Sequence, residues 1–149
     1  MSDAIEENIK EEGNEKIPLP NNKEYQLSIE LQLKLGIELY KKKHLAESLY
    51  FLSNVVSTRN DNMIGFYYYA KVCFYISRGF IDNFTVIVHD LQSLQIDFNK
   101  EAFTYSNLAA RFGCDKSKFI LARCYELGVG TDVNIFIPLF FFFSFHNIS

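Results

Sequence analysis

The chain contains 149 residues, of which 48% are hydrophobic and 16% are aromatic, and its formal net charge at pH 7 is −3. This length fits one ordinary domain, and the apolar content is enough to form a hydrophobic core. The acidic balance argues against a general nucleic-acid-binding protein, because such proteins present a basic surface to the phosphate backbone.

Residues 1–23 are rich in glutamate and asparagine, carry few large apolar side chains, and are interrupted by Pro18 and Pro20. Such a segment buries too little apolar surface to offset the loss of chain entropy, so we expect a disordered acidic tail. The alternative is a docking arm for a basic partner. An acidic, polar N-terminus does not resemble a secretory or transit peptide, which favours a cytoplasmic protein.

Two helices are predicted next, at the start of a helical repeat domain that spans 24–149. Leucines recur at every fourth residue from Leu27 to Leu39, and Ile29, Leu33 and Ile37 widen this row into the apolar stripe that we expect the first helix to bury. The lysines at 41–43 suit the negative end of that helix. A second helix is predicted from Leu45 to Val56, after a tight turn at Lys43–His44.

An aromatic-rich segment from Met63 to Ser77 follows, and its length favours a helix over a strand. The four consecutive aromatic residues at 66–69 cannot all point inward, because successive helical side chains face different sides. One interpretation is that some of these side chains line a groove or stack on a neighbouring repeat. The simpler interpretation is that all of them serve packing alone. The apolar spacing in residues 80–99 predicts a further helix with a break near Ile96–Asn99.

A helical hairpin is predicted for residues 102–130, which read AFTYSNLAARFGCDKSKFILARCYELGVG. Small and aromatic residues fall at helical spacing before Gly113, which we expect to end the first helix with a positive φ. Asp115 is the expected N-cap of the second helix. That helix carries a second apolar stripe and ends at two glycines: the stripe is Phe119, Leu121, Ala122, Cys124 and Tyr125, and the glycines are Gly128 and Gly130.

This hairpin resembles the SEL-one-like repeats, which are relatives of the tetratricopeptide repeats. Ser106 and Thr131 depart from the family pattern, Ala122 stands where a glycine is usual, and no Lys-Ala pair follows Asp132. The resemblance implies an all-α fold, an α-solenoid or right-handed superhelix of about three antiparallel helical hairpins. The positions that carry it are Ala102, Tyr105, Ala109, Ala110 and Gly113, followed by Ser117, Leu121, Ala122, Tyr125, Gly128 and Gly130.

Earlier segments repeat the same pattern in a degenerate form. Leu35–Gly36 and Tyr69–Ala70 are similar to Leu121–Ala122, and the start of the predicted helix 45–56 is similar to the start of 102–113. The first two pairs are about one repeat length apart, whereas the third is further on, so we expect an insertion or an elongated helix between them.

The C-terminal residues 135–145 read IFIPLFFFFSF. This is about half of the roughly 20 apolar residues that a spanning helix needs, so no transmembrane segment is predicted. Solenoids normally cover their last apolar face with a capping repeat, and none follows here. Either a partner covers this surface, or the chain is a shortened piece of a longer repeat protein, incomplete at its C-terminus. We expect poor solubility for the isolated chain.

No motif of a known chemistry occurs in the sequence. P-loop, GxGxxG, HExxH and GxSxG patterns are missing, and the three histidines are far apart. The three cysteines lack a CxxC spacing, and their odd number favours reduced, buried thiols in a cytosolic protein. We therefore predict no catalytic residue, no cofactor and no metal site.

These patterns predict a non-catalytic scaffold, adaptor or regulatory subunit that binds a protein or peptide partner and no nucleic acid. The resemblance implies assembly of signalling or membrane-associated complexes. The phrase KFILARCYELGVG is similar to repeats of fungal chitin-synthase activators, which implies activation of a membrane or cell-wall synthesis enzyme. Two alternatives stay open: a non-functional fragment of a longer repeat protein, and a small helical enzyme with no recognisable site. The expected protein-binding residues are Tyr40, Tyr67, Lys118 and Tyr125, with core packing as the alternative for each.

Overall fold

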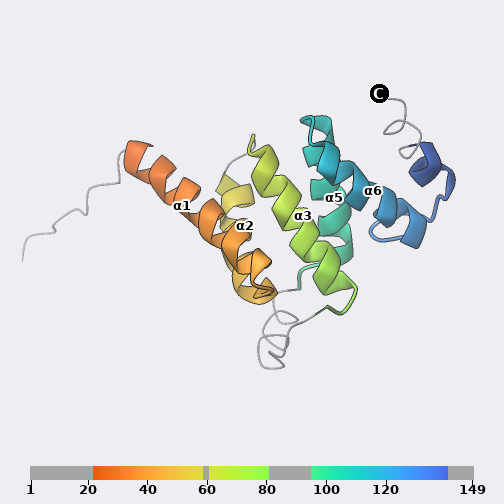
Figure 1. Cartoon of the computed structure of the whole chain (residues 1–149), viewed down its shortest axis with the longest axis horizontal. Helices are drawn as coiled ribbons and strands as arrows, with labels where there is room; N and C mark the ends of the chain where they lie inside the picture. The colour runs from red at the N-terminus through yellow and green to blue at the C-terminus, as the bar shows by residue number, and fades with distance from the viewer. Residues whose placement is uncertain (1–21, 59–60, 81–94, 141–149) are drawn as a thin grey trace, which may run out of the picture.

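The computed structural model describes residues 22–58, 61–80 and 95–140, and the regular structure within these ranges is helical, without a strand. This confirms the all-α prediction. Residues 1–21 of the predicted acidic tail, most of the predicted helix in 80–99 and the end of the phenylalanine-rich segment lie outside the described residues. The tail was expected to reach residue 23, but Asn22 and Lys23 already belong to the first helix. The helices are α1 (Asn22–Lys41), α2 (Leu45–Thr58), α3 (Met63–Ser77), α5 (Phe98–Arg111) and α6 (Asp115–Leu127) (Figure 1).

Two pairs of helices, α1 with α2 and α5 with α6, form hairpins that share one turn geometry. The turn residue has a positive φ in both, 65° at Lys43 and 94° at Gly113, at the two places where turns were predicted. This is the Schellman motif, in which N–H groups beyond the helix return to its last carbonyls. The N–H of His44 donates to Leu39 at 2.9 Å, and the N–H of Cys114 donates to Ala109 at 3.0 Å.

A buried serine joins the two helices of each hairpin. The Ser48 hydroxyl in α2 donates to the Gly36 carbonyl in α1 at 2.7 Å, and the Ser117 hydroxyl in α6 donates to the Ser106 carbonyl in α5 at 2.7 Å. Both acceptors lie equally far in sequence before their turns, whereas Ser48 lies one residue further beyond its turn than Ser117 does, so the two bonds are similar but not equivalent. The crossing is close: a Cβ atom on Gly36 would lie 2.7 Å from Cγ of Leu52.

Helix α3 is the centre of the described fold, because it contacts α1, α2, α5 and α6. In Figure 1, α1, α3 and α6 lie toward the viewer, and α2 and α5 lie behind them. The packing of α3 on α5 is antiparallel: Phe66 lies 5.9 Å from Phe112, and Tyr69 lies 4.8 Å from Tyr105, between ring centroids. The core includes Leu49, Leu52 and Val56 of α2, Phe66, Tyr69, Val72 and Cys73 of α3, Ala102 and Ala109 of α5, and Ile120 and Cys124 of α6.

The apolar stripe predicted for α1 is wrong for two members of its leucine row, Leu31 and Leu35, and is confirmed for Ile29. Leu31 and Leu35 are 54% and 40% exposed, whereas Ile29 is 3% exposed. The buried face instead contains Ile29 and Gly36, with Leu33 partly buried against the core. The close approach of α2 at Gly36 fixes the rotation of α1. Because adjacent helical residues are about 100° apart, Leu35 is then turned away from α2.

Two predictions for α6 are also wrong. Cys114, and not Asp115, occupies the N-cap position, and Asp115 is the first helical residue, where its carboxylate pairs with Lys118 at 2.9 Å. Phe119, which was expected in the buried stripe, is 61% exposed, whereas Leu121 is buried. Residues two apart on a helix face different sides, so only one of Phe119 and Leu121 can point into the core.

After α6 the chain turns back over the start of α5. Gly130 has a φ of 68°, and a Cβ atom on it would overlap the backbone carbonyl of Asn99. Residues 136–140 are helical, and Phe136 and Phe140 there are 76% and 69% exposed. Within the described ranges, no helix has the length and apolar character to cross a membrane.

Candidate functional site

Two cavities lie along the outer face of α3, one on the side of α1 and the other on the side of α6. The first has a volume of about 520 Å³ and lies between the α1–α2 turn and the end of α3. The second has a volume of about 480 Å³ and lies between α3 and α6. Because Tyr75 and Phe80 line both cavities, we describe them together as the α1–α3–α6 groove.

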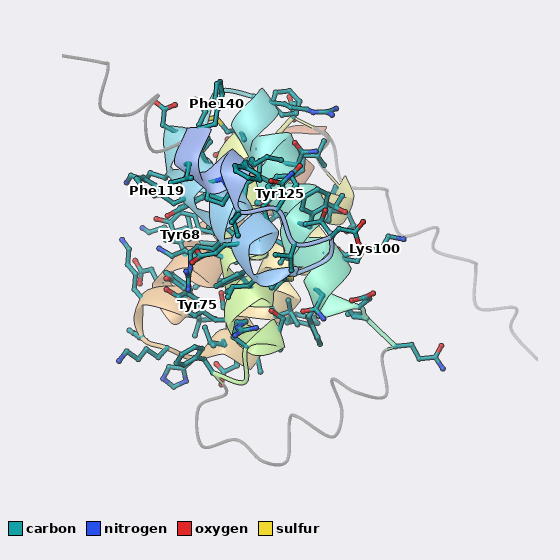
Figure 2. The ribbon with its side chains drawn as sticks, turned by 90° about the vertical axis from the view of Figure 1, so that its right-hand side faces the viewer. Tyr68, Tyr75, Lys100, Phe119, Tyr125 and Phe140 are labelled. Atoms are coloured by element: carbon teal, nitrogen blue, oxygen red, sulfur yellow. The ribbon has the colours of Figure 1, made fainter. Side chains whose placement is uncertain are left out.

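Helical periodicity places the groove residues on one stripe of each helix. Helix α3 contributes Tyr67, Lys71 and Phe74, which are four and three residues apart, and α6 contributes a stripe with the same spacing from Lys116 through Ile120 to Arg123. Side chains at these steps lie above one another on one helix face. In Figure 2, Tyr68, Tyr75 and Phe119 lie along one side of the molecule, and Lys100 lies on the opposite side.

The consecutive aromatic residues of α3 divide between the core and the groove. Phe66 and Tyr69 are 3% and 4% exposed and face α5, whereas Tyr67 and Tyr68 are partly exposed. Tyr68 contacts Tyr67 and Tyr40 edge-on, with ring centroids 4.9 and 5.7 Å apart. Of the four, Tyr67 lines a cavity, whereas Phe66 and Tyr69 pack in the core.

Lys71 lies at the centre of the groove and is held by tyrosines from two helices. Its Nζ lies 5.0 Å from the ring centroid of Tyr40 and 5.4 Å from that of Tyr67, and it donates a hydrogen bond to the Tyr67 hydroxyl at 3.2 Å. Burial alone lowers the pKa of Lys71, but hydrogen bonds with Tyr40 and Tyr67 outweigh it and raise this pKa. Lys71 is therefore a fixed positive charge near neutral pH.

The charge of the groove is opposite to that of the chain as a whole, which carries −3. No carboxylate is present among the described residues that line either cavity. Arg123 does pair with an acid, Glu126, one turn further along α6. The cationic side chains that line the groove are Lys41, Lys43, Lys71, Lys116 and Arg123.

The structure brings together two of the four residues predicted to contact a partner. Tyr40 and Tyr67 line the groove and flank Lys71. Lys118 and Tyr125 lie on another face of α6, where Lys118 pairs with Asp115 and the Tyr125 ring lies edge-on to Phe103 at 5.4 Å. Sequence reasoning missed four groove residues that the helical spacing from Tyr67 and the α6 pattern could have indicated: Lys71, Tyr75, Lys116 and Arg123.

A second cluster of titratable groups is buried between α3 and α5. The Tyr69 hydroxyl donates a hydrogen bond to the Glu101 carboxylate at 3.0 Å, and Cys73 lies beside them, fully buried. Burial raises the pKa of Tyr69 and of Cys73 well above their usual values, and burial raises the pKa of Cys124 to about 11. A nucleophilic thiol needs a lowered pKa, so these buried cysteines have the properties of structural residues.

Metal-ligating side chains do not gather in groups of three or more in the described ranges. Cys73, Cys114 and Cys124 are free thiols, two of them buried and Cys114 partly exposed. The described lining of the groove combines aromatic surface with positive charge. Comparisons of the chain with protein-family models, curated proteins and solved structures find no match, so the SEL-one-like resemblance stays an interpretation of the sequence pattern.

Proposed function

We propose that the protein is a non-catalytic scaffold or adaptor that holds a segment of a partner protein in the α1–α3–α6 groove. The observation that carries this proposal is one surface, built from α1, α3 and α6, on which aromatic and cationic side chains line two adjoining cavities. Aromatic residues and arginine are enriched in protein interfaces and lysine is depleted there, so this support comes from the aromatic residues and Arg123. Each cavity is of the size of ordinary ligand pockets, about 300–1,000 Å³, which is ample for an amino-acid side chain.

We also propose that the helices form a short α-solenoid of the SEL-one-like type. The alternation of two layers, with α1, α3 and α6 in front of α2 and α5, supports this arrangement. The repeated turn at the ends of α1 and α5 supports it as well. In a solenoid each helical pair covers the next and leaves one continuous face for binding. Activation of a membrane or cell-wall synthesis enzyme, as a narrower role, rests on the resemblance of KFILARCYELGVG alone.

A displayed random-peptide library, selected against the purified full chain, tests whether the groove binds polypeptide segments. Selected peptides are then labelled and titrated by fluorescence anisotropy against the wild type, Tyr67→Ala and Tyr125→Ala. We expect Tyr67→Ala to weaken binding by about tenfold, or about 1.4 kcal/mol, because it removes an aromatic contact surface in the groove. Tyr125→Ala is the matched control, since Tyr125 is a partly buried tyrosine that packs on Phe103 outside the groove.

Circular dichroism of both variants separates loss of binding from loss of helix. The proposed function fails if no peptide is selected, or if the selected peptides bind Tyr67→Ala and the wild type equally.

A further inference from the structure

We propose that the α1–α3–α6 groove recognises an acidic segment of a partner protein that carries a bulky apolar side chain between its acidic residues. This inference rests on the proposed function and specifies its ligand chemistry. The apolar side chain enters the cavity between Tyr40, Tyr75 and Phe80. Acidic side chains on either side of it meet cations at the two ends of the groove.

The distribution of charge points to an acidic ligand. Lys41 and Lys43 line one end of the groove, Lys116 and Arg123 line the other, and Lys71 lies between them. The described lining of both cavities contains no carboxylate, although the chain has more acidic than basic residues. Charges of one sign in a cleft with apolar walls focus the field, which attracts ligands of the opposite sign.

The aromatic walls point to a bulky apolar side chain at the centre of the ligand. Tyr40 stacks on Tyr75 with ring centroids 6.3 Å apart and an interplanar angle of 26°, and Phe80 meets Tyr75 edge-on at 5.7 Å. These three rings form the wall of the larger cavity, and Phe80 is 63% exposed there. A ligand side chain that covers the exposed part of this wall, chiefly Phe80, removes apolar surface from water, which a fully charged peptide cannot do.

A basic groove with aromatic residues can also bind single-stranded nucleic acid, where successive bases stack on open ring faces. Here Lys71 Nζ lies 5.0 Å from the Tyr40 ring centroid, and Tyr40 also stacks on Tyr75. Because Tyr40 already has these two neighbours, it is a poor stacking platform for a base. The net charge of −3 also disfavours a polyanion that extends beyond the groove.

Anisotropy titrations of the full chain with a matched set of labelled synthetic peptides test the proposal. The probe is a glutamate-rich peptide with one central phenylalanine. Its controls replace the glutamates by glutamines, or the phenylalanine by alanine, at constant length. We expect each replacement to weaken binding by about tenfold, and high salt to weaken only the glutamate peptide.

Two charge-reversal variants locate the binding surface. Lys116→Glu changes an exposed residue in the first turn of α6 that lines the groove, and we expect it to weaken binding of the glutamate peptide by about tenfold. Lys100→Glu is the matched control, because it makes the same charge change in the first turn of α5 on the opposite side of the molecule (Figure 2). It should leave binding unchanged.

Four outcomes overturn this inference. Equal binding of the glutamate and glutamine peptides refutes the acidic ligand, and equal loss in Lys116→Glu and Lys100→Glu refutes the groove as its site. A labelled oligothymidylate that binds the groove more tightly than the peptide assigns the surface to nucleic acid. If the glutamate peptide binds only after the acidic residues of segment 1–21 are changed to the corresponding amides, the chain's own N-terminal segment is the occupant of the groove. If library peptides of neutral charge still bind and depend on Tyr67, the proposed function stands while this inference fails.

Discussion

The two hairpins reach the same backbone geometry with different residues at the turn. In the α1–α2 hairpin a lysine, Lys43, adopts the left-handed conformation with φ 65°, and in the α5–α6 hairpin a glycine, Gly113, adopts it with φ 94°. The buried serine bond across each hairpin has the same length, 2.7 Å. Since glycine tolerates this conformation and lysine does not favour it, we infer that packing across the hairpin sets the turn and that the turn residue accommodates it.

The largest expected effect on stability comes from substituting a glycine of the α5–α6 hairpin. Comparing two such glycines separates the cost of a steric contact from the cost of the turn conformation. Gly130→Ala places a methyl group against the backbone carbonyl of Asn99, which cannot move without shifting the start of α5. Gly113→Ala meets no atom within 4 Å, so it carries only the cost of a positive φ. We expect a loss of about 3 kcal/mol in the free energy of unfolding for Gly130→Ala and about 1 kcal/mol for Gly113→Ala.

Urea unfolding followed by circular dichroism measures both losses. Equal losses for the two variants contradict the contact between Gly130 and α5, because the turn conformation would then account for the whole effect.

The next effect tests whether the two serine bonds are energetically equivalent. Ser48→Ala and Ser117→Ala each remove a fully buried hydroxyl that donates to a carbonyl of the preceding helix. We expect each to lower the free energy of unfolding by about 1.5 kcal/mol. Ser57→Ala is the control, because Ser57 is exposed and bonds only to Asn54 in its own helix, and it should change stability by less than about 0.5 kcal/mol.

If Ser117→Ala costs as little as Ser57→Ala while Ser48→Ala costs the expected amount, the serine bond stabilises only the first hairpin. The comparison between the hairpins then reduces to the geometry of their turns.

The positions of the helices could be predicted from the sequence, but the direction in which each helix faces could not. Local signals fix several ends: the predicted and observed bounds of α3 coincide, and the turns at Lys43 and Gly113 lie where charge and glycine patterns placed them. The start of α5 was missed, because α5 begins at Phe98, inside the break expected at Ile96–Asn99. The rotation of α1 depends on the contact of Gly36 with Leu52, which is made only after the chain has folded back. The leucine row gives no information on that contact, so Leu35 was assigned to the wrong face.

The same limit explains how much of the groove could be predicted. Tyr67 was chosen from four consecutive aromatic residues that cannot all point inward, and Tyr40 as a residue of the expected inner helices; both line the groove. On α6, Lys118 and Tyr125 were expected contacts, but the rotation of this helix could not be predicted, as the exposed Phe119 also shows. Because Phe119 is exposed, Lys116 faces the groove and Lys118 does not.

A smaller effect tests the strain that the comparison assigns to Lys43. Lys43→Gly removes the cost of a left-handed lysine, and we expect it to stabilise the protein by about 1 kcal/mol, less the entropy that glycine gains in the unfolded chain. This gain corresponds to a rise in Tm of about 2–4 °C for a domain of this size. Differential scanning calorimetry measures it. No change, or a fall, in Tm indicates that contacts of the Lys43 side chain already offset the strain.

The smallest expected effect concerns the residue that follows each turn. His44 and Cys114 occupy the N-cap positions of α2 and α6, since the carbonyl of His44 accepts from Ser48 N–H at 2.9 Å and that of Cys114 accepts from Ser117 N–H at 3.2 Å. Cys114 makes no side-chain cap bond, whereas His44 lies 3.9 Å from Glu47. A serine at either position can accept a free N–H of the first turn.

We therefore expect Cys114→Ser to stabilise the protein by about 0.5 kcal/mol, because it adds a cap bond where none exists. His44→Ser should gain less, since it also removes the contact with Glu47, a weak exposed pair. Parallel urea titrations of the two variants measure the difference. A larger gain in stability from His44→Ser than from Cys114→Ser would show that the start of α2, as well as the strained turn, lowers the stability of the first hairpin. The two hairpins would then differ at two positions and not at one.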